Sequence, residues 1–134
     1  ALDFLKRKVL ADNGVILKML IETIRNDVET ANADNPLRDA MVKTLQIFEE
    51  TLNILLAKSE EDRKAVDPGA YHFLQLSGLV LMHWLGMHLY AAATEDTEYH
   101  RRLQAALTLS ATGLAEEAQL LAKLANQEGT EIKL

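Results

Sequence analysis

Apolar residues recur along this chain at intervals of three and four positions, the spacing that places side chains on one face of an α-helix. The first stretch of this kind predicts a helix over residues 12–33, whose start Asp12 and Asn13 can cap. The side chains that would face the core of the protein are Ile16, Leu17, Leu20, Ile21, Ile24 and Val28.

A capping residue followed by proline marks two further helix starts, because proline at the first helical position has no amide hydrogen to lose. Asn35-Pro36 precedes an expected helix over residues 36–58, and Asp67-Pro68 precedes an expected helix over residues 68–93. The inner face of the former helix would comprise Leu37, Met41, Leu45, Phe48, Leu52 and Leu55.

The expected helix over residues 68–93 carries apolar side chains around nearly its whole circumference. This pattern is typical of a helix that is buried on most sides, so the helix is expected either to be central or to contact another subunit. We expect no membrane span, because His72, His83 and His88 interrupt the apolar run and would be costly in hydrocarbon.

The last apolar stretch predicts a helix over residues 96–128, with Asp96 or Thr97 as its cap and Gly129 as its end. Residues 130–134 would then form a loose tail. No alternation typical of β-strands is present in the sequence.

Four helices joined by short turns predict an all-α, up-and-down four-helix bundle over residues 12–129, preceded by a short lead-in at residues 1–11. Gly78, Gly86 and Gly113 lie inside the expected helices, where each glycine costs about 1 kcal/mol relative to alanine. Close crossing of the third and fourth helices would compensate for this cost, and we expect those two helices to approach tightly.

Charge and cysteine content exclude several classes of function. The net charge of −6 and the scattered basic residues argue against a nucleic-acid partner, which needs a concentrated basic face. The absence of cysteine excludes disulfides, thiolate nucleophiles and metal sites with sulfur ligands, and permits a cytoplasmic location.

Bundles of this kind often hold two metal ions between glutamates and Glu-x-x-His motifs, but no Glu-x-x-His occurs in the chain. The neighbouring carboxylates of Glu49-Glu50 and Glu116-Glu117 would diverge around a helix and are expected to face solvent. His83 and His88 are five positions apart, whereas a zinc pair on a helix prefers four. We therefore predict no catalytic, cofactor-binding or metal-binding residue in this chain.

The other histidines are expected to lie buried or at an interface and to form hydrogen bonds, and only His100, in a charged neighbourhood, is expected to be freely exposed. The chain also lacks a Gly-x-Ser-x-Gly elbow and the glycine-rich loops that bind phosphates and dinucleotides. Nucleophilic and nucleotide chemistry are therefore not expected.

Two segments resemble a bacterial group of FAD-dependent acyl-CoA dehydrogenases that carries an extra C-terminal helical domain. The opening Ala-Leu-Asp-Phe-Leu-Lys-Arg-Lys-Val at residues 1–9 is similar to the segment that follows the Tyr-Glu-Gly-Thr catalytic motif of that group. The phrase Tyr-His-Phe-Leu-Gln-Leu-Ser-Gly-Leu-Val at residues 71–80 resembles a Tyr- and Gly-bearing apolar phrase in the extra domain.

The resemblance implies that residues 1–11 continue from a catalytic domain upstream, and the start at Ala1 without methionine agrees with that expectation. In such enzymes a glutamate removes the α-proton of an acyl-CoA while hydride passes to FAD, giving a 2-enoyl-CoA. That glutamate would lie before Ala1. The chain itself would be an accessory domain with a structural or subunit-contact role. Its implied partners are the upstream domains and further subunits of a homo-oligomer, and the parent enzyme would pass electrons to an electron-transfer flavoprotein.

Two other functions remain open from the sequence. A free-standing helical-bundle interaction module would explain the apolar third helix equally well. A metal-dependent oxidase of the ferritin type shares the expected fold, although the glutamate and histidine motifs that such an oxidase needs are missing.

Overall fold

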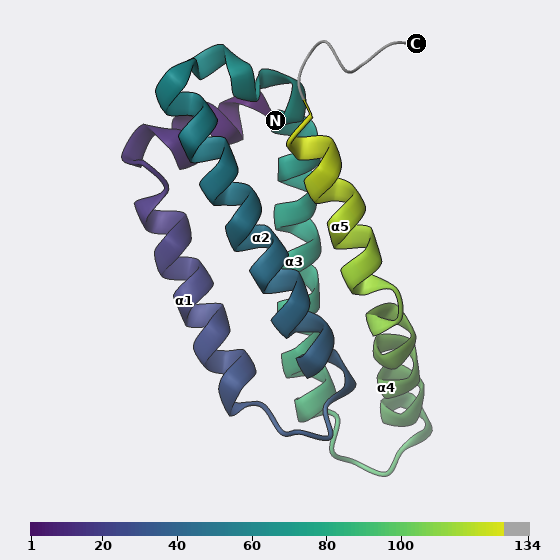
Figure 1. Ribbon diagram of the computed structural model, residues 1–134. Helices are drawn as coiled ribbons and strands as arrows, with labels where there is room; N and C mark the ends of the chain where they lie inside the picture. Colours follow the sequence, from purple (N-terminus) through teal and green to yellow (C-terminus); the bar gives the residue numbers. More distant parts are fainter. Residues whose placement is uncertain (128–134) are drawn as a thin grey trace, which may run out of the picture.

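The computed structural model describes residues 1–127, which form five α-helices (Figure 1). α1, α2 and α3 run alternately along the length of the molecule, and α4 and α5 both run back in the direction opposite to α3. Within the described residues there is no β-strand, so the prediction of an all-α fold is confirmed. Gly129 and the tail 130–134 lie outside the described residues. The helices are α1 (Val15–Thr30), α2 (Pro36–Glu61), α3 (Ala70–Ala92), α4 (Glu98–Ala111) and α5 (Leu114–Ala125), with a π-helical segment (Phe4–Val9) and two 3₁₀ segments (Leu10–Asp12 and Arg63–Gly69).

Side-chain caps fix the starts of two helices where the sequence indicated them, α2 and α4. The cap position of α1 is taken by Gly14 rather than by Asp12 or Asn13, although the Asp12 carboxylate accepts hydrogen bonds from the amides of Gly14 and Ile16. The side-chain oxygen of Asn35 accepts from the amide of Leu37 at 3.1 Å. Of the two residues proposed as the cap of α4, Thr97 fills that position and accepts from the amide of His100.

The start expected at Asp67-Pro68 is wrong by two residues, since α3 begins at Ala70 and both residues lie in the preceding 3₁₀ segment. The Asp67 carboxylate is held 2.7 Å from the Lys6 ammonium group instead of capping a helix. A contact with the N-terminal segment, which local sequence does not reveal, therefore decides the role of this aspartate.

The single helix expected over residues 96–128 is also wrong, because the chain divides it into α4 and α5. Gly113 adopts a left-handed backbone conformation with φ of 79°, which a continuous α-helix cannot contain. The break allows α5 to change direction relative to α4 and to pack along both α2 and α3.

α2 contacts the other four α-helices, α1, α3, α4 and α5. The Phe48 ring of α2 stacks on the Phe73 ring of α3 with centroids 5.5 Å apart. α3 also packs against α4, α5 and the N-terminal segment, but one of its sides stays exposed.

The N-terminal segment contributes to the same core. Its Leu5, Val9 and Leu10 side chains are buried, and Phe4 stacks on Phe73 with centroids 6.2 Å apart. The segment expected as a lead-in at residues 1–11 thus packs as part of the helical domain.

The expected close helix crossing occurs at Gly86, where an added Cβ would lie 3.2 Å from the Leu107 and Leu37 side chains. The same expectation is wrong at Gly78, where no atom lies within 4 Å of the position that a Cβ would take. Gly78 lies on the outward face of α3, and within residues 1–127 no packing compensates for its cost to the helix.

Candidate functional site

The outward face of α3 exposes large apolar side chains along nearly its whole length. At 100° per residue these side chains fall within an arc of about 100°, which makes one stripe rather than scattered positions. The stripe consists of Tyr71, Leu74, Leu81, Met82, Leu85 and Leu89, which are between 37% and 70% exposed. We call these six residues the α3 face.

The opposite side of the same helix is buried against the core through Phe73, Leu76 and Val80, each fully inaccessible to solvent. The helix is therefore apolar on two sides for two different reasons. One side stabilises the fold, and the other has no packing partner within residues 1–127.

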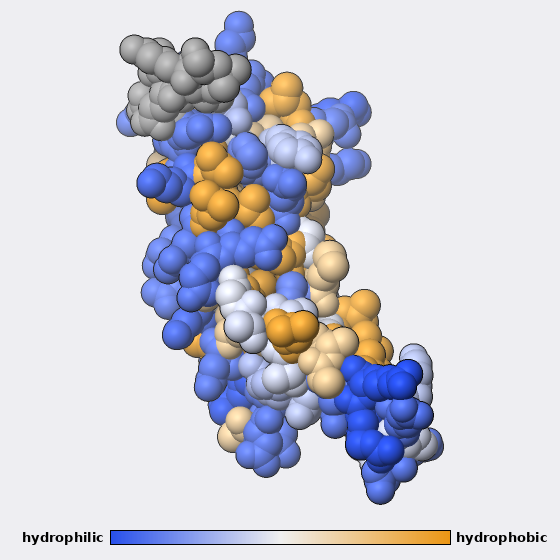
Figure 2. Space-filling view, turned by 90° about the vertical axis from the view of Figure 1, so that its right-hand side faces the viewer, coloured by the Kyte–Doolittle hydropathy of each residue, from blue (hydrophilic) through white to orange (hydrophobic). Residues whose placement is uncertain are grey.

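Apolar exposure on α4 and α5 is more dispersed. Figure 2, which looks onto the side formed by α4 and α5, shows separate orange patches interrupted by hydrophilic residues. Leu109 on α4 and Leu120 on α5 are 74% and 57% exposed. Single exposed apolar residues are common on protein surfaces, whereas a continuous stripe marks an interaction site.

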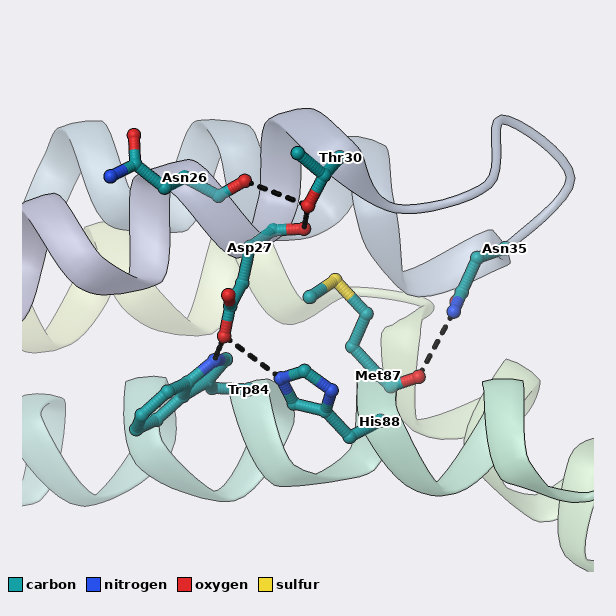
Figure 3. Close-up of polar contacts among 7 residues, drawn as sticks. All are labelled: Asn26, Asp27, Thr30, Asn35, Trp84, Met87 and His88. Carbon is teal, nitrogen blue, oxygen red and sulfur yellow. Dashed lines mark hydrogen bonds and ion pairs between the residues drawn. The ribbon is translucent and has the colours of Figure 1, made fainter.

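A polar cluster joins α1 to α3 beside the α3 face (Figure 3). One carboxylate oxygen of Asp27 accepts a hydrogen bond from the indole N–H of Trp84 at 2.9 Å and lies 3.0 Å from Nε2 of His88. Trp84 and His88 are one helical turn apart, so both reach the same carboxylate.

Both contacts favour the ionised form of Asp27. The hydrogen bond from the Trp84 indole, followed by that of His88, lowers the pKa of the Asp27 carboxyl below its ordinary value of 3.8, against a smaller opposing effect of burial. The cluster therefore holds a carboxylate in place between two helices.

Asn35 forms a second link between elements that are distant in the sequence. Its side-chain N–H donates to the backbone carbonyl of Met87 at 3.0 Å, while its oxygen caps α2. Between these two links lies a groove of about 250 Å³, which Asp27, Asn35 and His88 help to line.

This groove lacks the features of a catalytic centre. Its one carboxylate already accepts hydrogen bonds from Trp84 and His88, and no second carboxylate lines the groove. Among residues 1–127, no group of three or more histidine, aspartate or glutamate side chains could hold a metal ion.

The four histidines form hydrogen bonds in different surroundings. His83 contacts the backbone carbonyls of Leu79 and Ser110, and His72 lies 3.2 Å from the Gln75 side chain. The expectation that only His100 would be freely exposed is wrong. His100 is half-buried and accepts a hydrogen bond from the amide of Glu95, whereas His88 is 54% exposed.

The two carboxylates of each glutamate pair diverge as expected, but not all four face solvent. Glu116 and Glu117 are both exposed, but Glu49 is half-buried and forms an ion pair with Arg25 at 3.0 Å. Neither pair converges on a common position.

A groove of about 520 Å³ near the α3–α4 connection is a poor fit for FAD, the cofactor implied by the resemblance. Its ionisable lining consists of Asp34, Glu95, Asp96 and Arg101, and Arg101 is paired with Asp96. The pyrophosphate of FAD would meet three carboxylates there, which repel it. This groove therefore does not provide a flavin site.

Comparisons with known protein families, with curated proteins and with solved structures gave no match to this chain. Among the residues that the structure describes, no helix combines the length and the apolarity that a membrane crossing requires.

The sequence analysis did not single out Asp27, although a signal was present. Trp84 and His88 stand four positions apart on one side of an apolar helix, and both can donate to the same acceptor. The pattern indicates a shared partner but cannot identify it, because Asp27 is 57 residues away from Trp84.

Proposed function

We propose that this chain is the C-terminal accessory domain of an FAD-dependent acyl-CoA dehydrogenase and that it provides a structural contact rather than a catalytic group. In this proposal the domain is an up-and-down four-helix bundle whose fourth position is shared by α4 and α5. The parent enzyme acts in the cytoplasm, oxidises acyl-CoA to 2-enoyl-CoA and passes electrons to an electron-transfer flavoprotein.

The α3 face is the observation that carries the contact role. An uncharged apolar stripe of six large side chains is costly to leave in water, and burying it would gain about 25 cal/mol per Å². The resemblance of residues 1–9 and 71–80 to the dehydrogenase group supplies the identity of the parent. The polar cluster supports the same role, since it braces α3 against α1 beside the exposed stripe.

The gene sequence preceding the codon for Ala1 tests the identity of the parent. The proposal requires a Tyr-Glu-Gly-Thr motif within a few codons and flavin-binding domains before it. A start codon directly before Ala1 would refute the dehydrogenase proposal and favour a free-standing interaction module.

Titration calorimetry tests whether the isolated domain binds FAD or an acyl-CoA. The isolated chain is expected to bind neither FAD nor an acyl-CoA, because the groove near the α3–α4 connection is lined by carboxylates. The longer polypeptide is expected to show the visible absorption of bound flavin. A stoichiometric flavin complex with the isolated chain would contradict the proposal that the upstream domains, and not this domain, bind FAD.

A further inference from the structure

The α3 face has the sequence pattern of a helix that pairs with another helix. Starting from Tyr71, positions 71, 74, 78, 81, 85 and 88 follow one another at alternating intervals of three and four. This is the heptad spacing of residues along a seam between two helices, and Met82 and Leu89 flank it.

The size of the stripe matches the requirement of a pair. From Tyr71 to Leu89 it extends over roughly 27 Å at 1.5 Å per residue. Its six side chains are on average about half exposed, and with about 150–250 Å² for each they present roughly 600 Å². Two such stripes in contact would bury about 1,200 Å², the lower end of the range for specific protein interfaces.

The absence of charge on the stripe makes it the part of this acidic chain on which a second copy can pack without repulsion. α3 contains no aspartate, glutamate, lysine or arginine, although the chain as a whole has a net charge of −6. A self-contact through α3 therefore brings no like charges together, whereas a contact through the acidic remainder of the surface would.

We propose that a second copy of this chain covers the α3 face, with the two α3 helices antiparallel about a twofold axis. This inference rests on the contact role proposed above and names its partner. With the axis between positions 78 and 81, Tyr71 faces the partner's His88, Leu74 faces the partner's Leu85, and Gly78 faces the partner's Leu81. At the centre of the pair each Leu81 then lies opposite a glycine. At each end the phenol ring of Tyr71 meets the imidazole ring of the partner's His88.

The position of Gly78 supports this arrangement. Glycine in a helix interior costs about 1 kcal/mol relative to alanine, and beyond the adjacent backbone of α3 no atom of residues 1–127 lies within 4 Å of the position that a Cβ of Gly78 would take. Close approach of a second helix at this point is a use for that space, because the lack of a side chain lets the two backbones come together.

Sedimentation equilibrium of the full 134-residue chain tests the proposal. The chain is expected to be a dimer, and Leu85→Glu is expected to weaken dimerisation at least tenfold while keeping the helical circular dichroism of the wild type. Leu109→Glu is the matched control, since Leu109 is even more exposed but lies on α4. This variant should dimerise like the wild type.

A monomeric wild-type chain, or a Leu85→Glu variant that dimerises as tightly as the wild type, would overturn the proposal. If Leu85→Glu unfolds, Met82→Glu replaces it, because Met82 is 70% exposed and has fewer contacts to lose.

Cross-linking tests the geometry independently of any destabilising change. The chain has no cysteine, so Leu81→Cys introduces a single thiol that lies next to its symmetry mate across the proposed axis. A short bismaleimide should convert this variant to covalent dimers, and Leu109→Cys should remain mostly monomeric. Equal yields for the two variants would refute the antiparallel α3 pair.

Failure of this inference is distinguishable from failure of the proposed function. One possible result is that the isolated chain is monomeric and that Leu85→Glu loosens the domain from its upstream domains in the longer polypeptide. This result would refute the proposed dimer but agree with the proposed contact role. The identity of the parent enzyme is tested separately by the gene sequence.

Discussion

Replacing Gly69 by alanine tests how the end of α5 is held against the turn that precedes α3. A Cβ at this position would lie 1.8 Å from the carbonyl oxygen of Ala125 and 2.6 Å from its carbonyl carbon, where real Cβ atoms keep at least 3.0 Å. The obstacle is backbone, so it cannot be relieved by rotating a side chain. The end of α5 would have to withdraw, although Ala125 is only 1% exposed.

We expect Gly69→Ala to destabilise the fold by about 3 kcal/mol, the upper part of the range for overpacking. For a chain of this length that corresponds to a fall of roughly 10 °C in the melting temperature. Strain in the backbone of residue 69 does not contribute, because its φ of −93° and ψ of −6° are open to alanine.

Urea unfolding followed by circular dichroism measures this loss, and Gly86→Ala is the matched control. Gly86 is also buried, but its added Cβ would meet only the ends of the Leu37 and Leu107 side chains at 3.2 Å. These can shift by a few tenths of an ångström, and alanine favours the helix by about 1 kcal/mol, so little net change is expected. If Gly69→Ala unfolds at the same urea concentration as Gly86→Ala, the close packing of α5 on this turn is refuted.

Three further changes test other parts of the structure. Gly78→Ala should stabilise the chain by about 0.5–1 kcal/mol in urea unfolding at concentrations where it is monomeric, and a loss would show that position 78 is not open. Trp84→Phe removes the donor to Asp27 and should cost about 1 kcal/mol in the same assay, whereas an unchanged midpoint would show that this hydrogen bond does not brace α1 and α3. The lowered pKa of Asp27 contributes stability above its ordinary value of 3.8 that is lost as the pH falls through the folded-state value. Asp27→Asn should therefore lose less stability than the wild type on acidification below about pH 4, and parallel losses would contradict the shift.

Local signals in the sequence were sufficient to predict the helical regions and several of their starts. Asn35 and Thr97 act within three residues of their own positions, so their capping roles depend little on the rest of the fold. The break at Gly113 is different, since a glycine inside an apolar pattern is compatible with both a continuous helix and a left-handed residue. The packing of α5 against α2 and α3 decides between the two.

Periodicity also could not assign the two apolar sides of α3. Phe73 and Leu85 are both large apolar residues, although Phe73 is buried and Leu85 is exposed. The sequence pattern is the same for a side that packs within the chain and for a side that is left exposed. The link from Trp84 and His88 to Asp27 was hidden for a related reason, because it depends on how α1 and α3 lie side by side.

The two hydrogen bonds of Asn35 have a consequence for the order in which the protein folds. The bond to the Leu37 amide can form as soon as the first turn of α2 forms, but the bond to the Met87 carbonyl requires α3 to be in place. The side chain is fixed in one orientation only when both are made. Completion of the α2 start and docking of α3 therefore belong to one cooperative step, and the turn between α1 and α2 opens together with the core rather than as an independently fraying loop.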